Sequence, residues 1–141
     1  MNLFAKMFVA LHVGIYRLTG GVIGGNMGFQ VLLLTTTGRK SGKSRTVTLG
    51  LFEDGGELLV TATAGGSQVH PAWYNNLVAN PTVTVQRGRR VFRATAEPTT
   101  GEERKRLWAA IVAQAPQFAG YEKKATPREI PVVRFRELSP G

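Results

Sequence analysis

Residues 31–52 read VLLLTTTGRKSGKSRTVTLGLF, and this stretch decides the fold class. Val31–Thr37 is apolar and β-branched, which is typical of a buried strand. Thr46–Phe52 alternates, and every second residue from Val47 to Leu51 is apolar, as in a strand with one buried face. A basic loop with two glycines joins the segments, so the stretch predicts a pair of strands connected by a turn.

Further strands follow at the spacing of hairpins. Asp54–Gly56 is a turn signal between the second strand and a predicted strand at Leu58–Thr63. Val83–Arg87 and Val91–Ala96 form a second predicted hairpin around a glycine, and Ile130–Phe135 is the last predicted strand. About six short strands predict a small antiparallel barrel with helices packed outside it, in a mainly-β, α+β fold.

Three later segments read as helical. His70–Ala79 is expected to be a short helix. Thr100–Ala115 is a longer one, with Thr100 as its N-cap and Glu103 completing a capping box. Pro116–Lys124 is expected to be short, helical or irregular, and to carry aromatic side chains.

The first 28 residues read as a helix and a loop. Apolar side chains recur at helical spacing over residues 1–18 and predict an amphipathic helix. Residues 19–28 are rich in glycine and predict a flexible loop. No repeat or linker divides the chain, so residues 1–141 are expected to form a single domain.

Composition excludes several kinds of site. The chain has 141 residues and no cysteine, which excludes disulfides, iron–sulfur ligation and thiol catalysis. Its two histidines cannot supply a Cys/His zinc site, and no metal is expected. The net charge is +9, and all the acidic residues lie at or after Glu53. Such a basic excess indicates an anionic partner: nucleic acid, an acidic membrane or a phosphorylated small molecule.

The basic loop Gly38–Arg45 is the first candidate site. It contains the G-K-S of a nucleotide-binding P-loop, but Thr37 stands where that motif requires glycine, and a strand follows instead of a helix. What remains is a turn with two glycines, a hydroxyl and four cations, whose amides and arginine forks suit an anion. A merely solvated hairpin tip is the alternative.

Two other segments are candidates for the wall of a binding site. The small residues of Thr61–Gly66 permit close approach of the backbone to a flat ligand, although an ordinary strand exit has the same composition. His70–Leu77 brings Trp, Tyr and two Asn to the start of a helix, where they line a pocket or plug the end of the barrel. We expect His70 itself to be a capping or surface residue rather than a catalytic base.

Three runs of sequence, taken together and in order, resemble the deazaflavin (coenzyme F420)-dependent nitroreductase family. The runs are Leu34–Gly42, His70–Leu77 with Ala79–Pro81, and Arg128–Val133, and the resemblance spans roughly residues 3–137. It implies a split β-barrel and a cytoplasmic oxidoreductase. Reduced F420 would pass a hydride to a flat, electron-poor small molecule: a quinone, a conjugated enone or lactone, or a nitroaromatic compound. F420 carries a phosphodiester and a polyglutamate tail, which would use the basic excess.

The resemblance also implies the residues that hold the cofactor. Those expected at the phosphate, with the strand beside it, are Arg39, Lys40, Ser41, Arg45, Thr46, Val47, Thr48, Leu49 and Gly50. Those expected along the deazaflavin are Thr61, Ala62, Thr63 and Ala64. Those expected near the phosphate and tail are Ala72, Trp73, Tyr74, Asn75 and Asn76.

The acceptor would stack in an apolar mouth lined by Trp73, Phe118 and Tyr121, with Phe118 also against the cofactor. Tyr121, or water, would donate the proton that follows the hydride. Ala115 and Phe118 stand where the family's substrate pocket carries tyrosines, and Ala64 stands where it carries lysine. We therefore expect F420 binding without efficient activation of bicyclic nitroimidazoles.

Three alternatives stay open. Split barrels also host FMN, which shares the phosphate but lacks the tail. A nucleic-acid module could use the basic clusters Arg39–Arg45 and Arg87–Arg93, but only Phe92 offers a ring near the second cluster, so we expect no nucleic-acid partner. Residues 1–18 could contact lipid at the inner face of the cell membrane, although packing of this helix on the barrel is favoured. The sequence leaves the oligomeric state open.

Overall fold

The computed structural model describes residues 30–139. The helix expected at residues 1–18 and the loop at 19–28 lie outside this range. The strands are β1 (Val31–Thr37), β2 (Ser44–Gly50), β3 (Phe52–Asp54), β4 (Glu57–Thr61), β5 (Thr82–Arg87), β6 (Arg90–Pro98) and β7 (Val132–Glu137). The helices are the 3-10 turn η1 (Ala64–Gly66), α2 (Ala72–Ala79), α3 (Gly101–Gln114) and α4 (Phe118–Ala125).

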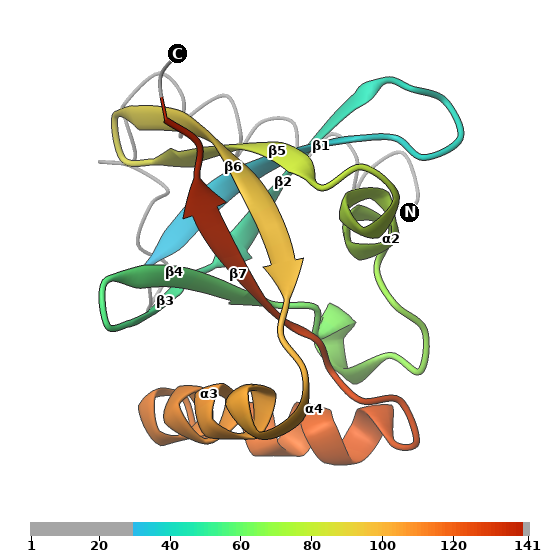
Figure 1. Ribbon diagram of the computed structural model, residues 1–141. Helices are drawn as coiled ribbons and strands as arrows, with labels where there is room; N and C mark the ends of the chain where they lie inside the picture. Colours follow the sequence, from blue (N-terminus) through green and yellow to red (C-terminus); the bar gives the residue numbers. More distant parts are fainter. Residues whose placement is uncertain (1–29, 140–141) are drawn as a thin grey trace.

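The strands form one antiparallel sheet in the order β2-β1-β5-β6-β7-β4-β3. The sheet curls, and β2 lies close to β4. In Figure 1, α3 and α4 lie together beneath the sheet, and α2 lies beside the turn between β1 and β2. The mainly-β architecture with peripheral helices is therefore confirmed. Among the described residues, no helix has both the length and the apolarity to cross a membrane.

Two clusters of buried side chains stabilise this arrangement, because alternate residues of each strand face opposite sides of the sheet. On β4, Val60 belongs to the inner cluster, which lies inside the curl of the sheet. Its neighbour Leu59 belongs to the outer cluster, which lies between the sheet and helices α3 and α4. The inner cluster also holds Leu32, Leu34, Leu77, Val85 and Val133. The outer cluster also holds Leu107, Trp108, Ile111, Ile130 and Val132.

The expected strand Thr46–Phe52 is in fact two strands. β2 pairs with β1 as far as Gly50, and β3 then pairs with β4 from Phe52 onward. Between them Leu51 is buried, and its N–H donates to the Gln30 carbonyl at 2.9 Å. The break comes from a change of pairing partner, which the alternation of apolar residues does not reveal. The sheet therefore has seven strands rather than about six.

The capping box expected at the start of α3 is wrong. Thr100 is the N-cap residue, but its side chain makes no capping hydrogen bond. The Glu103 carboxylate instead pairs with Arg134 on β7, a cation that also contacts Glu57 and Glu97. A long-range ion pair has replaced the local bond that the spacing predicted.

Candidate functional site

A cavity of about 320 Å³ opens between strands β2 and β4, the loop after β4, and helices α2 and α4. This volume is at the lower end of the range for small-molecule sites, about 300–1,000 Å³. Its lining comes from four separate segments of the sequence. The residues are Thr48, Leu49, Gly50, Thr61, Thr63, Ala64, Gly65, Trp73, Gln117, Phe118 and Tyr121. All except Gly65 and Gln117 belong to the set expected from the sequence. The fold brings together residues expected along the ring (61, 63 and 64), beside the phosphate (48–50), and at the acceptor (73, 118 and 121).

The loop after β4 forms one wall of this cavity in a constrained conformation. Ala64 has a φ of 48°, and it is the one non-glycine residue of the described chain with a positive φ. Gly65 and Gly66 continue with φ values of 62° and 83°. A left-handed alanine costs about 1–2 kcal/mol, and such strain persists where the surrounding contacts hold it in place. Ala62 is fully buried in the inner cluster and does not line the cavity.

Helix α2 supplies one wall residue and one structural anchor. Trp73 is buried and lines the cavity. Asn76 is also buried; its amide nitrogen donates to Thr36 Oγ1 at 3.2 Å, and its Oδ1 accepts from the Arg39 N–H at 3.1 Å. Both ends of the amide are therefore used within the protein. The structure places Asn76 as the link between α2 and the basic turn.

The basic turn lies outside the cavity. The side chains of Arg39, Lys40, Lys43 and Arg45 are exposed, and none pairs with an acidic group in residues 30–139. The Ser41 hydroxyl accepts from the Lys43 N–H at 3.1 Å. Gly42 has a φ of 70°, and Gly38 closes the turn by donating to the Lys43 carbonyl at 2.8 Å. The turn therefore presents four uncompensated cations on an ordered backbone.

Three further residues of the expected cofactor site contact other parts of the protein and do not line the first cavity. Thr46 bonds through its hydroxyl to Thr35 Oγ1 at 2.8 Å. Val47 and Tyr74 pack against the inner cluster and do not line the cavity. Burial raises the pKa of the Tyr74 phenol, so it stays protonated at neutral pH.

The second basic cluster differs from the first in its electrostatics. Arg87 pairs with Glu53, and Arg90 pairs with Glu137 and lies over the ring of Phe92. Two of the four arginines of Arg87–Arg93 are thus neutralised within the fold. The unbalanced positive charge on this side of the described chain is weaker than at residues 39–45.

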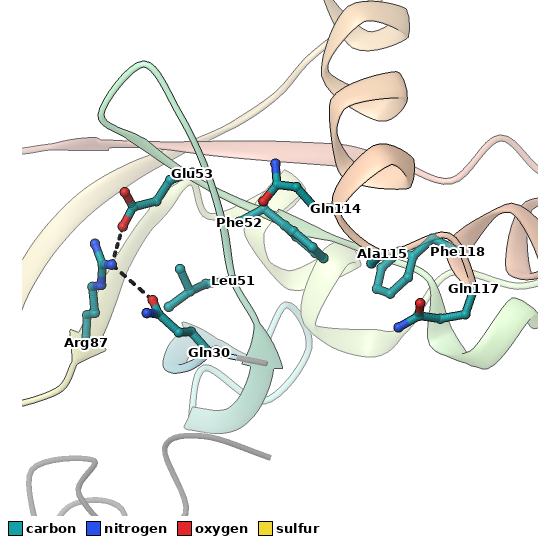
Figure 2. A pocket seen from close by; sticks show the side chains of 9 residues that line it. All are labelled: Gln30, Leu51, Phe52, Glu53, Arg87, Gln114, Ala115, Gln117 and Phe118. Atoms are coloured by element: carbon teal, nitrogen blue, oxygen red, sulfur yellow. Dashed lines mark hydrogen bonds and ion pairs between the residues drawn. The ribbon is translucent and has the colours of Figure 1, made fainter. Parts of the chain in front are cut away.

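A second cavity, of about 460 Å³, adjoins the first (Figure 2). Figure 2 shows the Arg87–Glu53 pair at one side and Phe118 with Gln117 at the other. Its lining residues are Gln30, Leu51, Phe52, Glu53, Arg87, Gln114, Ala115, Gln117 and Phe118. Gln117 and Phe118 line both cavities, so they form the partition between them.

The partition belongs to a small aromatic group. The Phe118 ring stands edge-on to Phe52, with centroids 5.3 Å apart, and edge-on to Tyr121 at 5.2 Å. Sequence reasoning included Phe118 and Tyr121 but missed Gln114 and Gln117. No motif marks these glutamines, because their position depends on how α3 and α4 pack beneath the sheet.

His70 was expected to be a capping or a surface residue, and it is a surface residue. The N-cap of α2 is Pro71. Nδ1 of His70 lies 3.1 Å from Nη1 of Arg128. Desolvation, and then the charge of Arg128, lower the pKa of the His70 imidazole. Because Arg128 is a donor, Nδ1 acts as the acceptor.

The profile of the family described as F420H(2)-dependent quinone reductase matches residues 8–137. An F420H(2)-dependent quinone reductase of Mycobacterium tuberculosis is 39% identical over 128 residues, covering 87% of this chain and 85% of the relative.

Two solved structures are also similar. One, an F420-H2 dependent reductase termed FDR-A, has a TM-score of 0.68 and 45% identity, and the match covers 75% of this chain and 93% of that one. The other, described as a domain-swapped dimer, has a TM-score of 0.71 and 40% identity over 90% of this chain and 95% of that one. The split β-barrel expected from the sequence is thereby confirmed.

Proposed function

Since the chain belongs to the F420H(2)-dependent quinone reductase family, it is an oxidoreductase that uses coenzyme F420, and we propose how its residues divide the cofactor and the acceptor between them. The ring of F420 occupies the 320 Å³ cavity, the phosphate and tail lie along the basic turn, and a quinone enters from the 460 Å³ cavity. When bound, reduced F420 supplies the hydride; the protein supplies position, electrostatics and exclusion of water.

The observation that carries this proposal is the pairing of two unlike surfaces. A cavity walled by Trp73, Phe118 and Tyr121 suits a planar ring. The four exposed cations of the basic turn, which pair with no acidic group in residues 30–139, suit a phosphodiester and several carboxylates. The bond from the Arg39 N–H to Asn76 holds the turn against the helix that carries Trp73. A ligand with a flat head and an anionic tail fits both parts at once.

The second cavity supports a quinone as the acceptor. Phe52 and Phe118 offer aromatic faces for a flat ring, and the amides of Gln114 and Gln117 can donate to its carbonyl oxygens. Because Phe118 and Gln117 also line the first cavity, an acceptor there lies next to the cofactor ring, which hydride transfer requires. Tyr121, whose ring contacts Phe118, is the nearest candidate to donate the accompanying proton.

The expected contact of residues 1–18 with the inner face of the membrane lies outside the described residues and stays a prediction, as does action in the cytoplasm. The substrate is a small molecule, and no nucleic-acid partner is proposed, because the second basic cluster is partly neutralised.

A binding titration tests the proposal. Oxidised F420 and FMN are titrated separately into the wild-type protein and into Arg39→Ala and Lys40→Ala, with fluorescence as the readout. Arg106→Ala and Lys105→Ala remove the same charges from the exposed surface of α3 and serve as matched controls. We expect the dissociation constant of F420 to rise about 10-fold in the first pair and to stay unchanged in the second.

Binding of FMN without F420 would contradict the cofactor assignment and keep the cavity. F420 binding that is equally strong in all four variants would contradict the role of the basic turn.

A further inference from the structure

Arg128 stands in one of the runs that carry the family resemblance, and it lines neither cavity. It precedes β7, and its guanidinium donates to three main-chain carbonyls of one short loop. Nη1 donates to Ala62 at 2.9 Å, Nη2 to Thr63 at 2.8 Å, and Nε to Ser67 at 2.9 Å. A planar fork with five donors is suited to hold several acceptors in fixed directions.

The clamped loop is the wall of the first cavity. Thr63, Ala64 and Gly65 line that cavity, and Arg128 does not. In a trans peptide the C=O and the following N–H point in opposite directions. Because the carbonyls of Ala62 and Thr63 accept from Arg128, the N–H groups of Thr63 and Ala64 point away from its guanidinium.

The backbone conformation makes these amides converge. Thr63 is right-handed, with φ −66° and ψ −39°, and Ala64 is left-handed, with φ 48°. Successive residues of this kind form a nest, in which neighbouring N–H groups face a common point and bind an oxygen atom. Within the described chain, the N–H groups of residues 63–65 donate to no other residue, whereas Gly66 and Ser67 donate back to Thr63 and Ala64.

A purely structural clamp would not need this geometry. Arg104 is such a clamp: it is buried and donates twice to one carbonyl, that of Ile130, away from either cavity. Arg128 instead holds the segment that contains the strained Ala64, and strain of this kind is maintained where the surroundings over-determine the backbone.

We propose that Arg128 is a positioning residue that fixes the amides of Thr63, Ala64 and Gly65 as a donor nest for a conjugated carbonyl oxygen at the edge of the bound ring. The inference rests on the proposed function and deepens it. Preorganised donors favour the form of the ring in which that oxygen carries more negative charge, so the nest would tune the ring as well as orient it.

The first test needs no ligand. Hydrogen exchange is compared between the wild type and Arg128→Lys, which keeps the charge but loses the fork. We expect faster exchange of the hydrogen-bonded N–H groups of Ala62, Gly66 and Ser67, and unchanged exchange in the rest of the sheet. Equal exchange in this loop would overturn the positioning role.

The second test separates the ring from the tail. Oxidised F420 and a deazaflavin that lacks the phosphodiester and glutamates are titrated into each variant. Arg128→Lys should raise the dissociation constants of both ligands about 10-fold or more. At saturation it should also reduce the shift of the long-wavelength absorption band of the bound ring. Lys40→Ala should weaken F420 alone. Ile111→Val, a mild core substitution in α3, should weaken neither and controls for lost stability.

A matched pair of loop variants tests the nest even if Arg128→Lys folds poorly. Thr63→Pro removes one N–H at a φ that proline accepts, whereas Thr63→Ala removes the side chain and keeps the N–H. We expect weaker binding of the tail-less ring by Thr63→Pro than by Thr63→Ala. Equal binding by this pair, or wild-type binding by Arg128→Lys, would overturn the inference alone. Failure of the wild type to bind either ligand would overturn the proposed function and the inference with it.

Discussion

The main-chain N–H of Arg39 donates to Oδ1 of Asn76 at 3.1 Å, and this bond connects the first turn of the sheet to helix α2. The same amide donates to Thr36 Oγ1 at 3.2 Å, so one buried side chain joins β1, the basic turn and the helix that bears Trp73. The position of the basic turn relative to α2 is therefore set by a residue whose own polar atoms are bonded within the protein.

Replacing Asn76 should separate the two halves of the site. Asn76→Ala leaves the Arg39 N–H and the Thr36 hydroxyl without partners, which should lower the free energy of unfolding by about 1–3 kcal/mol. It should also weaken the binding of F420 more than the binding of a tail-less deazaflavin, because the basic turn shifts while the lining of the cavity is unchanged. Urea unfolding and the two titrations measure this. Asn80→Ala, at the exposed end of the same helix, is the control. Equal weakening of both ligands would argue against the link.

Replacing Ala64 with glycine should stabilise the protein, although an alanine-to-glycine substitution usually destabilises one. Ala64→Gly removes a left-handed β-carbon and should raise the free energy of unfolding by up to about 1 kcal/mol. Ala109→Gly, on the exposed face of α3, should lower it by about the same amount. Urea denaturation of the pair gives both signs directly. A loss of stability in Ala64→Gly would mean that Ala64 is not strained.

The second cavity can be filled without touching the first. Ala115 lines the second cavity and not the first. Ala115→Trp should therefore raise the KM for a soluble quinone about 10-fold and leave the dissociation constant of F420 unchanged. Steady-state kinetics and the F420 titration separate the two effects. Ala109→Trp on the exposed face of α3, the helix that ends just before Ala115, is the control. An unchanged KM would place the acceptor elsewhere.

His70 should contribute to the pH dependence of stability. Its pKa in the folded protein is lowered, first by desolvation and then by Arg128, so the unfolded chain binds its proton more readily. Its contribution is therefore complete above the unfolded pKa, near 6.5, and is lost as the pH falls through the folded pKa. His70→Gln should flatten the decline in unfolding free energy between about pH 7 and pH 5. Parallel urea titrations at several pH values measure the slopes, and identical slopes would contradict the assignment.

Features encoded by neighbouring residues were predictable from the sequence. The turn at Gly55 and Gly56 was expected from its Asp-Gly-Gly sequence, and both glycines have positive φ. β1 was predicted over the residues it occupies, because a β-branched apolar run bounded by glycine has few other conformations. The cluster of cations in the basic turn was also predictable, because these residues lie close together in the sequence.

Features that depend on distant partners were not predictable. The break at Leu51 follows from a change of pairing partner, and the failed capping box follows from the attraction of Arg134 for Glu103. Arg128 and the carbonyl of Thr63 are 65 residues apart. Gln117 enters both cavities through the packing of α4, which no local pattern encodes.

A crystal structure of the protein with oxidised F420 tests the central claim most directly. The account predicts the ring in the cavity bounded by Trp73 and the loop of residues 63–65, with the phosphodiester within hydrogen-bond distance of residues 39–41. A ring bound outside that cavity, or a phosphodiester bound at the second basic cluster, Arg87–Arg93, would contradict it.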